Sequence, residues 1–191
     1  LRLGPPPGPS AVAQGGLASA GDALRAGRVV VRCADRMEFG PRALGARSLL
    51  LSARGVDAAA ALNTALGRDP VMPFGPVMAE EAAGDYLVGW GPKVEEMTRF
   101  MTVALPATDR LRRVAPAAVH ADGTARAQVL RAGEDPVLHA LLCSLGEPVL
   151  INTSCNTHGE PIVCTAQQAE RVARAVGAAV ILRDVESSTA G

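Results

Sequence analysis

Short apolar runs that alternate with helical patterns constrain the fold of this chain more than any other feature of its sequence. "RVVVRCA" (28–34), "EPVLINTS" (147–154) and "AAVILRD" (178–184) have the composition of buried strands. Four other segments have the apolar spacing, cap or terminal glycine of helices: "LASAGDALRAG" (17–27), "GVDAAAALNTALG" (55–67), "DPVLHALLCSLG" (135–146) and "TAQQAERVARAVG" (165–177). This interleaving predicts an α/β (α+β mixed) domain in which helices flank a twisted, mixed sheet.

The remaining segments have less regular patterns. "RFMTVALPAT" (99–108) and "ARAQVLRA" (125–132) alternate as strands do, whereas "RDPVMPFGPVMAEEAAGDYL" (68–87) is expected to be a proline-punctuated loop followed by the start of a helix. The first 16 residues are rich in proline and glycine and have no period. We therefore expect a linker at 1–16, one domain at 17–185 and a flexible tail at 186–191.

Composition argues against several classes of partner and location. The 191 residues carry 19 basic and 19 acidic side chains, so no net charge favours nucleic acid or an anionic membrane. Because the four cysteines form no C-x-x-C pair and no signal peptide is visible, we expect a reducing, cytoplasmic setting. The chain begins at Leu1 without an initiator methionine, so we also expect it to be part of a longer protein.

Arginines and glycines are concentrated in the loop "DRMEFGPRALGARS" (35–48). Arg36, Arg42 and Arg47 supply planar guanidinium groups that suit a phosphoryl group or a carboxylate. Glycines in this loop allow the backbone to approach a ligand closely. The loop could instead be an arginine-rich surface turn paired with Glu38.

A second loop, "VHADGTAR" (119–126), combines a base, an acid and an arginine. His120, Asp122 and Arg126 are therefore candidates for contacts to a substrate or nucleotide. The competing interpretation is an ordinary β-turn centred on the Asp-Gly pair.

The third loop, "NTSCNTHGEP" (152–161), follows a buried strand and is rich in amides and hydroxyls. Such groups at a strand end can cradle phosphate oxygens, which makes candidates of Asn152, Thr153, Ser154 and Asn156. The segment could also be a capped turn before a strand at 162–164. A nucleophile pair of Cys155 with His158 is a third interpretation, and a metal site that adds Cys164 is a fourth, although the spacing is not that of a closed zinc site.

Five segments together resemble a known family. The carboxy-terminal domain of the O-carbamoyltransferases of nodulation-factor and antibiotic biosynthesis has similar motifs in the same order as "RMEFGPRALGARSLL", "MPFGPVM", "RFMTVAL", "VHADGTARAQVL" and "INTSCNTHGEPIVCTAQQA". The resemblance covers residues 3–184, and its first and last motifs are highly specific. It implies a YrdC-like fold for the domain, and "NTSCNTHGEP" also resembles the signature of the YrdC-like threonylcarbamoyl-AMP synthases.

The resemblance implies a two-stage reaction. The YrdC-like domain of such enzymes uses ATP, with Mg²⁺ as its charge partner, and carbamoyl phosphate to form carbamoyl adenylate and pyrophosphate. An actin-like domain with a bound metal then transfers the carbamoyl group to a hydroxyl of a small acceptor, such as a sugar or an antibiotic intermediate. This chain contains only the first domain, so an amino-terminal actin-like domain or subunit is the expected partner.

The resemblance also assigns roles to single residues. Arg42 and Arg126 match arginines that hold carbamoyl phosphate or the adenylate, and Ser154 matches a serine of the same site. The remaining candidates, with roles in orienting Arg42 or binding the nucleotide, are Arg36, Arg47, Asn152, Thr153 and Asn156. We expect His158 to shape the loop or to lie at the edge of the ligand.

The middle loop departs from the fuller family pattern. A lysine and an arginine of that pattern are replaced here by Gly67 and Met72, and Arg68 is the residue expected to take over contacts to phosphate. Because of this departure, a second candidate function stays open, in which the chain is a catalytically silent module that binds a separate actin-like subunit. Threonylcarbamoyl-AMP synthesis is a third candidate function, disfavoured because "RMEFGPRALG" resembles the carbamoyltransferases.

Overall fold

The computed structural model describes residues 14–34, 36–69 and 73–183. Within them, a seven-stranded mixed sheet has the order β1 (Gln14–Gly15), β9 (Val180–Leu182), β2 (Val30–Cys33), β3 (Arg47–Ser52), β8 (Val149–Ser154), β4 (Gly75–Ala79) and β7 (Gln128–Leu130). The β2–β3, β3–β8 and β8–β4 pairs are antiparallel, whereas the β1–β9, β9–β2 and β4–β7 pairs are parallel. The predicted α/β domain with a mixed sheet is confirmed.

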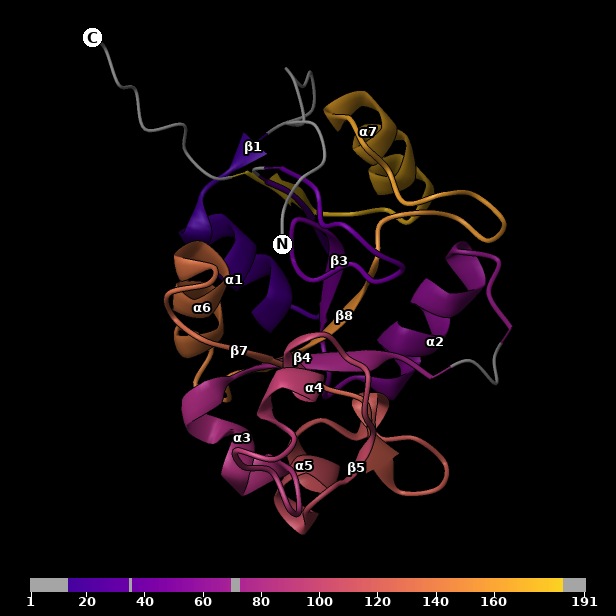
Figure 1. Cartoon of the computed structure of the whole chain (residues 1–191). Helices are drawn as coiled ribbons and strands as arrows, with labels where there is room; N and C mark the ends of the chain where they lie inside the picture. Colours follow the sequence, from indigo (N-terminus) through magenta and orange to yellow (C-terminus); the bar gives the residue numbers. More distant parts are fainter. Residues whose placement is uncertain (1–13, 35, 70–72, 184–191) are drawn as a thin grey trace, which may run out of the picture.

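Helices cover both faces of the sheet (Figure 1). One face packs against α1 (Leu17–Arg25) and α6 (Pro136–Cys143), and the other packs against α2 (Val56–Ala65) and α7 (Ala166–Ala175). Shorter elements lie at the end of the molecule near β4 and β7: α3 (Glu80–Tyr86), α4 (Glu95–Arg99), α5 (Asp109–Val114), the 3-10 turn Pro116–Ala118, and a two-stranded sheet of β5 (Leu105–Pro106) and β6 (Thr124–Ala125).

Successive strand residues contribute to two separate apolar cores. Leu50 and Leu150 pack with α1 and α6, whereas their neighbours Leu49, Leu51 and Ile151 belong to the core on the other side. Successive side chains of a strand point to opposite faces, so a sheet covered on both faces needs apolar residues in continuous runs. This is why the central strands are recognisable in the sequence.

Two sequence predictions in the middle of the chain are wrong. The segment 75–79, expected to be a loop, is the strand β4 between β8 and β7. Pro76 is tolerated because it lies near the start of the strand, and the ladder with β7 begins only at Val77. The strand expected at 99–108 is reduced to Leu105–Pro106, since α4 ends at Arg99 and Met101 turns the chain with a φ of 55°.

Further differences are local. The strand expected at 125–132 is divided into β6 and β7, with Arg126 in the gap between them. No strand forms at 162–164, where Val163 instead donates its N–H to the carbonyl of Cys155 at 3.0 Å. At the amino terminus, Gln14–Gly15 pair with β9, while 1–13 and the tail at 186–191 lie outside the described residues.

Among the helices that the structure describes, none is long and apolar enough to cross a membrane.

Candidate functional site

A pocket of about 250 Å³ lies at the edge of the sheet where β8 ends and β4 and β7 begin. Because β8 is antiparallel to β3 and β4, the end of β8 meets their beginnings at this edge. The pocket is lined by Pro41, Arg42, Ala43, Arg68, Pro73, Phe74, Gly75, Met101, Arg126, Asn152, Thr153, Ser154, Asn156, His158 and Gly159. All three loops singled out in the sequence contribute to it.

Arginines from three separate segments converge on the pocket. Arg42 comes from the loop between β2 and β3, Arg68 follows α2, and Arg126 lies between β6 and β7. Arg68 donates from Nη1 to Thr153 Oγ1 at 3.1 Å and lies over the ring of Phe74, with its guanidinium carbon 4.5 Å from the ring centroid. Among the described residues, no carboxylate forms an ion pair with any of these arginines.

The charges of these arginines act on one another. Burial lowers the pKa of Arg126 below its ordinary value, and the charge of Arg42 lowers it further. Burial likewise lowers the pKa of Arg68, and the charge of Arg126 adds to this effect. Arginine nevertheless stays protonated in proteins, so the site holds mutually repelling cations that a bound anion would stabilise.

Buried polar side chains hold the loop that carries Arg42. Glu38 Oε1 accepts the backbone N–H of Leu44 at 2.8 Å and that of Ala46 at 2.5 Å. Gln128 Nε2 donates to the carbonyl of Leu44 at 2.8 Å, and Asn152 Nδ2 donates to that of Ala43 at 3.1 Å. The backbone next to Arg42 is therefore fixed by side chains from its own loop and from two strands.

The same loop is fixed on its other side by a buried ion pair. Arg32 donates from Nη1 to Asp135 Oδ2 at 2.5 Å and from Nη2 to Oδ1 at 2.9 Å, and both side chains are almost completely buried. Arg32 Nη1 also donates to the carbonyl of Gly45 at 2.8 Å. Gly45 has a φ of +118°, and a Cβ there would lie 2.8 Å from Leu138 Cδ2, so a side chain is excluded at this position.

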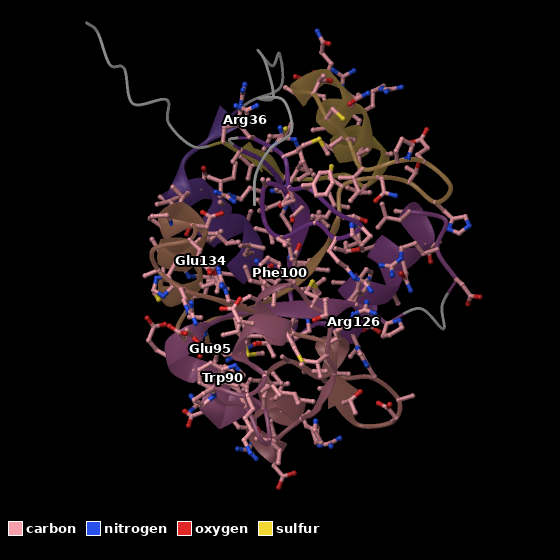
Figure 2. The ribbon with its side chains drawn as sticks, in the orientation of Figure 1. Arg36, Trp90, Glu95, Phe100, Arg126 and Glu134 are labelled. Carbon is pink, nitrogen blue, oxygen red and sulfur yellow. The ribbon has the colours of Figure 1, made fainter. Side chains whose placement is uncertain are left out.

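Four of the predicted site residues do not line the pocket. Arg36 is exposed, and Figure 2 shows it well apart from Arg126. Arg47 is buried in β3, where its Nη1 donates to the carbonyls of Ala34 and Ala46 at 2.7 and 2.9 Å. The other two, His120 and Asp122, belong to the turn before β6, and their roles remain predictions.

That turn is closed by hydrogen bonds to Thr124. Asp122 Oδ1 accepts from the backbone N–H and the hydroxyl of Thr124 at 2.9 and 2.7 Å, and His120 Nδ1 lies 3.1 Å from the same hydroxyl. Burial lowers the pKa of His120, the nearby Asp122 raises it, and the charge of Arg126 lowers it. His120 therefore lies near enough to Arg126 for the two charges to interact, although it does not line the pocket.

Cys155 and His158 lie in different environments, one in the core and the other at the surface. Cys155 is fully buried in the apolar core, and burial strongly raises the pKa of its thiol, which disfavours the reactive thiolate. His158 is exposed at the rim of the pocket. Among the described residues, no group of three or more His, Cys, Asp and Glu side chains could hold a metal ion.

The departure at Gly67 has a local structural reason. Gly67 follows the last turn of α2 with a φ of +65° and donates its N–H to the carbonyl of Thr64 at 3.0 Å. A lysine would be strained in this conformation. The next residue, Arg68, directs a cation to the pocket instead, while position 72 lies outside the described residues.

Several residues of the site are not among those predicted from the sequence. Phe74 and Met101 line the pocket, and Glu38 and Gln128 support its arginine loop. A Cβ on Gly75 would lie 2.2 Å from Met101 Cε and 2.9 Å from the backbone carbonyl oxygen of Arg126, so the close approach of the backbone favours glycine here. All four missed residues lie within the family motifs quoted from the sequence, but no periodic or compositional signal marks them as parts of the site.

Another pocket contains an arginine that is paired with carboxylates. It has a volume of about 290 Å³ and is lined by Glu38, Leu44, Arg99, Phe100, Gln128, Leu130 and Glu134; Figure 2 labels Phe100 and Glu134. There Arg99 is paired with Glu96 at 2.6 Å and with Glu134. Its charge is neutralised within the protein, so the first pocket is the better anion site despite its smaller volume.

Solved structures with the same fold include two distinct proteins. Full-length HypF in its phosphate- and nucleotide-bound form aligns with a TM-score of 0.66 at 20% identity, over 88% of this chain and 24% of HypF. P. abyssi Sua5 in complex with L-threonine aligns with a TM-score of 0.59 at 18% identity, over 88% of this chain and 46% of Sua5. The predicted YrdC-like fold is thereby confirmed.

Curated relatives are longer proteins. Nodulation protein NolO of Bradyrhizobium diazoefficiens is 33% identical over 159 residues, covering 79% of this chain and 28% of NolO. The 3'-hydroxymethylcephem-O-carbamoyltransferase of Streptomyces clavuligerus is 36% identical over 152 residues, covering 76% of this chain and 27% of that enzyme. Residues 21–185 match the family model "Carbamoyltransferase C-terminus", and the chain belongs to this family.

Proposed function

We propose that this chain forms carbamoyl adenylate from ATP and carbamoyl phosphate, as the carboxy-terminal part of an O-carbamoyltransferase. The observation that carries the proposal is the convergence of Arg42, Arg68 and Arg126 on one pocket, without a carboxylate among the described residues to neutralise them. The name of the Streptomyces relative, an O-carbamoyltransferase, and the phosphate and nucleotide bound by HypF support this proposal.

The proposed reaction consumes one water and releases two leaving groups. Water cleaves carbamoyl phosphate into carbamate and phosphate. A carbamate oxygen then attacks the α-phosphorus of ATP, so that a new O–P bond forms while the bond to the β-phosphate oxygen breaks and pyrophosphate leaves. Negative charge builds on the phosphoryl oxygens in this step, and we assign its stabilisation to Arg42 and Arg126, which line the pocket.

The size of the pocket suggests which part of the substrates it takes. Its volume of about 250 Å³ is below the roughly 300–1,000 Å³ usual for drug-sized ligands. We infer that it binds carbamoyl phosphate and the reacting phosphate, whereas the nucleoside extends beyond it. The hydroxyl of Ser154 and the side chain of Asn156 complete this inner part of the site.

Magnesium is the expected charge partner of ATP. In the described part of the chain, no group of three or more His, Cys, Asp and Glu side chains could hold a metal ion, whereas one or two carboxylates together with substrate phosphates suffice for Mg²⁺. We infer that Mg²⁺ enters with ATP as the counter-ion of the phosphates.

Transfer of the carbamoyl group to its acceptor is proposed to occur in another part of the enzyme. The chain spans less than a third of the length of the two curated relatives described above. We infer that an actin-like domain or subunit completes the enzyme and transfers the carbamoyl group to a hydroxyl of a small metabolite.

Release of pyrophosphate tests the proposal. The chain, mixed with ATP, carbamoyl phosphate and Mg²⁺, should release pyrophosphate, and Arg42→Ala or Arg126→Ala should slow the release by roughly 10²–10³-fold, as loss of a transition-state donor does elsewhere. Arg113→Ala is the matched control, because Arg113 is exposed on α5 and away from the pocket.

Two different results would indicate different functions. A folded chain that releases no pyrophosphate and shows no calorimetric binding of ATP or carbamoyl phosphate would be a silent module. Release that requires threonine and bicarbonate would indicate threonylcarbamoyl-AMP synthesis.

A further inference from the structure

The pocket of about 290 Å³ lined by Phe100 and Glu134 is separate from the arginine pocket at the end of β8, because no residue lines both (Figure 2). Adjacent residues of the arginine loop line the two: Ala43 belongs to the arginine pocket and Leu44 to the other. The proposed reaction uses none of the groups of this second pocket. We call it the Glu38 pocket, after the buried carboxylate among its lining residues.

Glu38 has one carboxylate oxygen that no described donor satisfies. The residue is only 7% exposed, and its Oε1 accepts the backbone N–H groups of Leu44 and Ala46 at 2.8 and 2.5 Å. Its Oε2 accepts from no described residue, yet it keeps some accessible surface, unlike the polar atoms that are sealed in the interior without a partner. Among the described residues, no cation pairs with Glu38. A buried carboxylate is costly without a cation, so a bound cation would stabilise it.

The other charged groups of the Glu38 pocket already have partners. Arg99 pairs through Nη1 with Glu96 at 2.6 Å and through Nη2 with Glu134. Glu134 Oε2 also accepts the backbone N–H of Arg131 at 3.4 Å. Because the charges of Arg99 and Glu134 cancel, the lining keeps the single negative charge of Glu38. The pocket therefore suits a cation that can donate a hydrogen bond.

The rest of the lining suits an aliphatic stem attached to that cation. Leu44 and Leu130 supply apolar surface, and Phe100 stays 39% exposed although the guanidinium carbon of Arg99 lies 5.4 Å from its ring centroid. Cations are attracted to aromatic rings, and a stem of methylene groups packs along apolar surface while its charged end stays polar. A metal ion would need several oxygen ligands, and the one free oxygen of Glu38 does not supply them.

The single free oxygen also distinguishes between organic cations. A guanidinium binds a carboxylate best through two parallel N–H···O bonds, one to each oxygen. In Glu38 this arrangement is blocked, because two backbone N–H groups already occupy Oε1. An ammonium is a compact charge that can donate to one oxygen and turn its other N–H groups to water or to the ring of Phe100.

We propose that the Glu38 pocket binds a primary alkylammonium group, either of a free amine or of a lysine side chain. The ammonium donates to Oε2 of Glu38, and its stem packs against Leu44, Leu130 and Phe100. The site goes beyond the proposed function and does not depend on it. It shares with the arginine pocket only the loop whose backbone Glu38 holds.

Amide NMR of the 191-residue chain at constant ionic strength tests the proposal. Pentylammonium should shift the backbone amide signals of Leu44 and Ala46, because their common acceptor is the group that binds the cation. Pentan-1-ol, which lacks the charge, should bind at least about tenfold more weakly, and pentylguanidinium should also bind more weakly. N-acetyl-lysine methylamide separates the two sources: its binding indicates a lysine side chain, and binding of pentylammonium alone indicates a free amine.

Glu38→Gln is the sharpest variant. Its amide keeps an acceptor for Leu44 and Ala46 but replaces the free oxygen with an NH₂ donor, so pentylammonium should bind at least about tenfold more weakly. Phe100→Leu should weaken binding about two- to fivefold, the usual effect of an exposed cation–π contact. Asp57→Asn is the control, because it removes an exposed charge on α2, away from the pocket, and should leave binding unchanged. Thermal unfolding verifies that each variant is folded, and Phe100→Leu carries the test if Glu38→Gln does not fold.

Four results would overturn the inference. Equal binding of pentan-1-ol would show that the pocket recognises the stem and not the charge. Undiminished binding in both Glu38→Gln and Phe100→Leu would place the ammonium elsewhere. Tighter binding of pentylguanidinium would assign the pocket to the other class of cation, and no shift with either cation would show that water satisfies Oε2. None of these results affects the release of pyrophosphate, so failure of this inference is distinct from failure of the proposed function.

Discussion

Asn152 donates from Nδ2 to Gln128 Oε1 at 2.7 Å, which joins the interior strand β8 to the edge strand β7. Both side chains also bind the backbone of the arginine loop, at Ala43 and Leu44. Most of the buried polar side chains of the described residues lie around this loop. Burying so many polar groups is costly unless each finds a partner, and here the partners fix the backbone that follows Arg42.

Glu38 is predicted to hold the arginine loop in place. Glu38→Ala would leave the N–H groups of Leu44 and Ala46 without an acceptor, which should lower the free energy of unfolding by about 1–3 kcal/mol per donor. Glu38→Gln keeps an acceptor oxygen and should lose less. Urea unfolding measures both, and equal stability of Glu38→Ala and wild type would contradict this role.

Removal of only one partner of the buried ion pair between Arg32 and Asp135 is predicted to destabilise the fold. Asp135→Ala leaves a buried guanidinium without its carboxylate and also removes the cap of α6, where Oδ1 accepts from the N–H of Leu138 at 3.0 Å. We expect a loss of about 3–5 kcal/mol in the free energy of unfolding.

A double variant is the control for this pair. Arg32→Met with Asp135→Asn removes both charges and keeps a capping oxygen, so it should be more stable than Asp135→Ala. Chemical denaturation compares the two. If Asp135→Ala cost less than about 1 kcal/mol, the pair would not be a structural support.

His120 is predicted to make stability depend on pH. Its pKa is lower in the folded chain than in the unfolded one, chiefly because of burial. As the pH falls below about 6.5, the unfolded chain therefore binds the proton first and stability decreases until the folded pKa is passed. Above about pH 6.5 the imidazole is neutral in both the folded and the unfolded chain, so His120 does not make the free energy of unfolding depend on pH.

His120→Gln should remove this part of the pH dependence. The comparison is the urea midpoint of both proteins at about pH 7.5 and about pH 5.5. The pKa values of the carboxyl groups of Asp122, Glu81 and Glu147 are lowered in the folded chain, so these groups stay ionised at both pH values of the comparison. A wild-type chain that becomes more stable on acidification relative to the variant would contradict the prediction.

Local patterns predicted those elements that are periodic in sequence. The apolar run that became β8 and the cap of α7 are examples, since Thr165 accepts from the N–H of Gln168 at 3.3 Å as a capping threonine should. The strand β4 was missed because Pro73 and Pro76 resemble a loop, and the alternation at 99–108 was outweighed by the turn at Met101.

Loop composition and family resemblance identified most of the arginines and amides of the pocket. They did not identify the side chains that hold the loop of Arg42 in place. Arg42, Arg126 and Ser154 lie together in the pocket, whereas the arginine pattern gave no indication that Arg47 would be buried in β3. Glu38 and Gln128 are separated by 90 residues of sequence and meet only through the backbone of Leu44. Both lie within family motifs, but a motif does not show which of its residues meet in the folded chain, and no period marks such tertiary contacts.

The most direct test of the central claim is exchange of radiolabelled pyrophosphate into ATP. If the arginine pocket supports formation of carbamoyl adenylate, label should enter ATP only when carbamoyl phosphate is present, and Arg42→Ala should abolish the exchange while Arg113→Ala retains it. A folded chain that exchanges no label, or exchanges it equally without carbamoyl phosphate, would contradict the account.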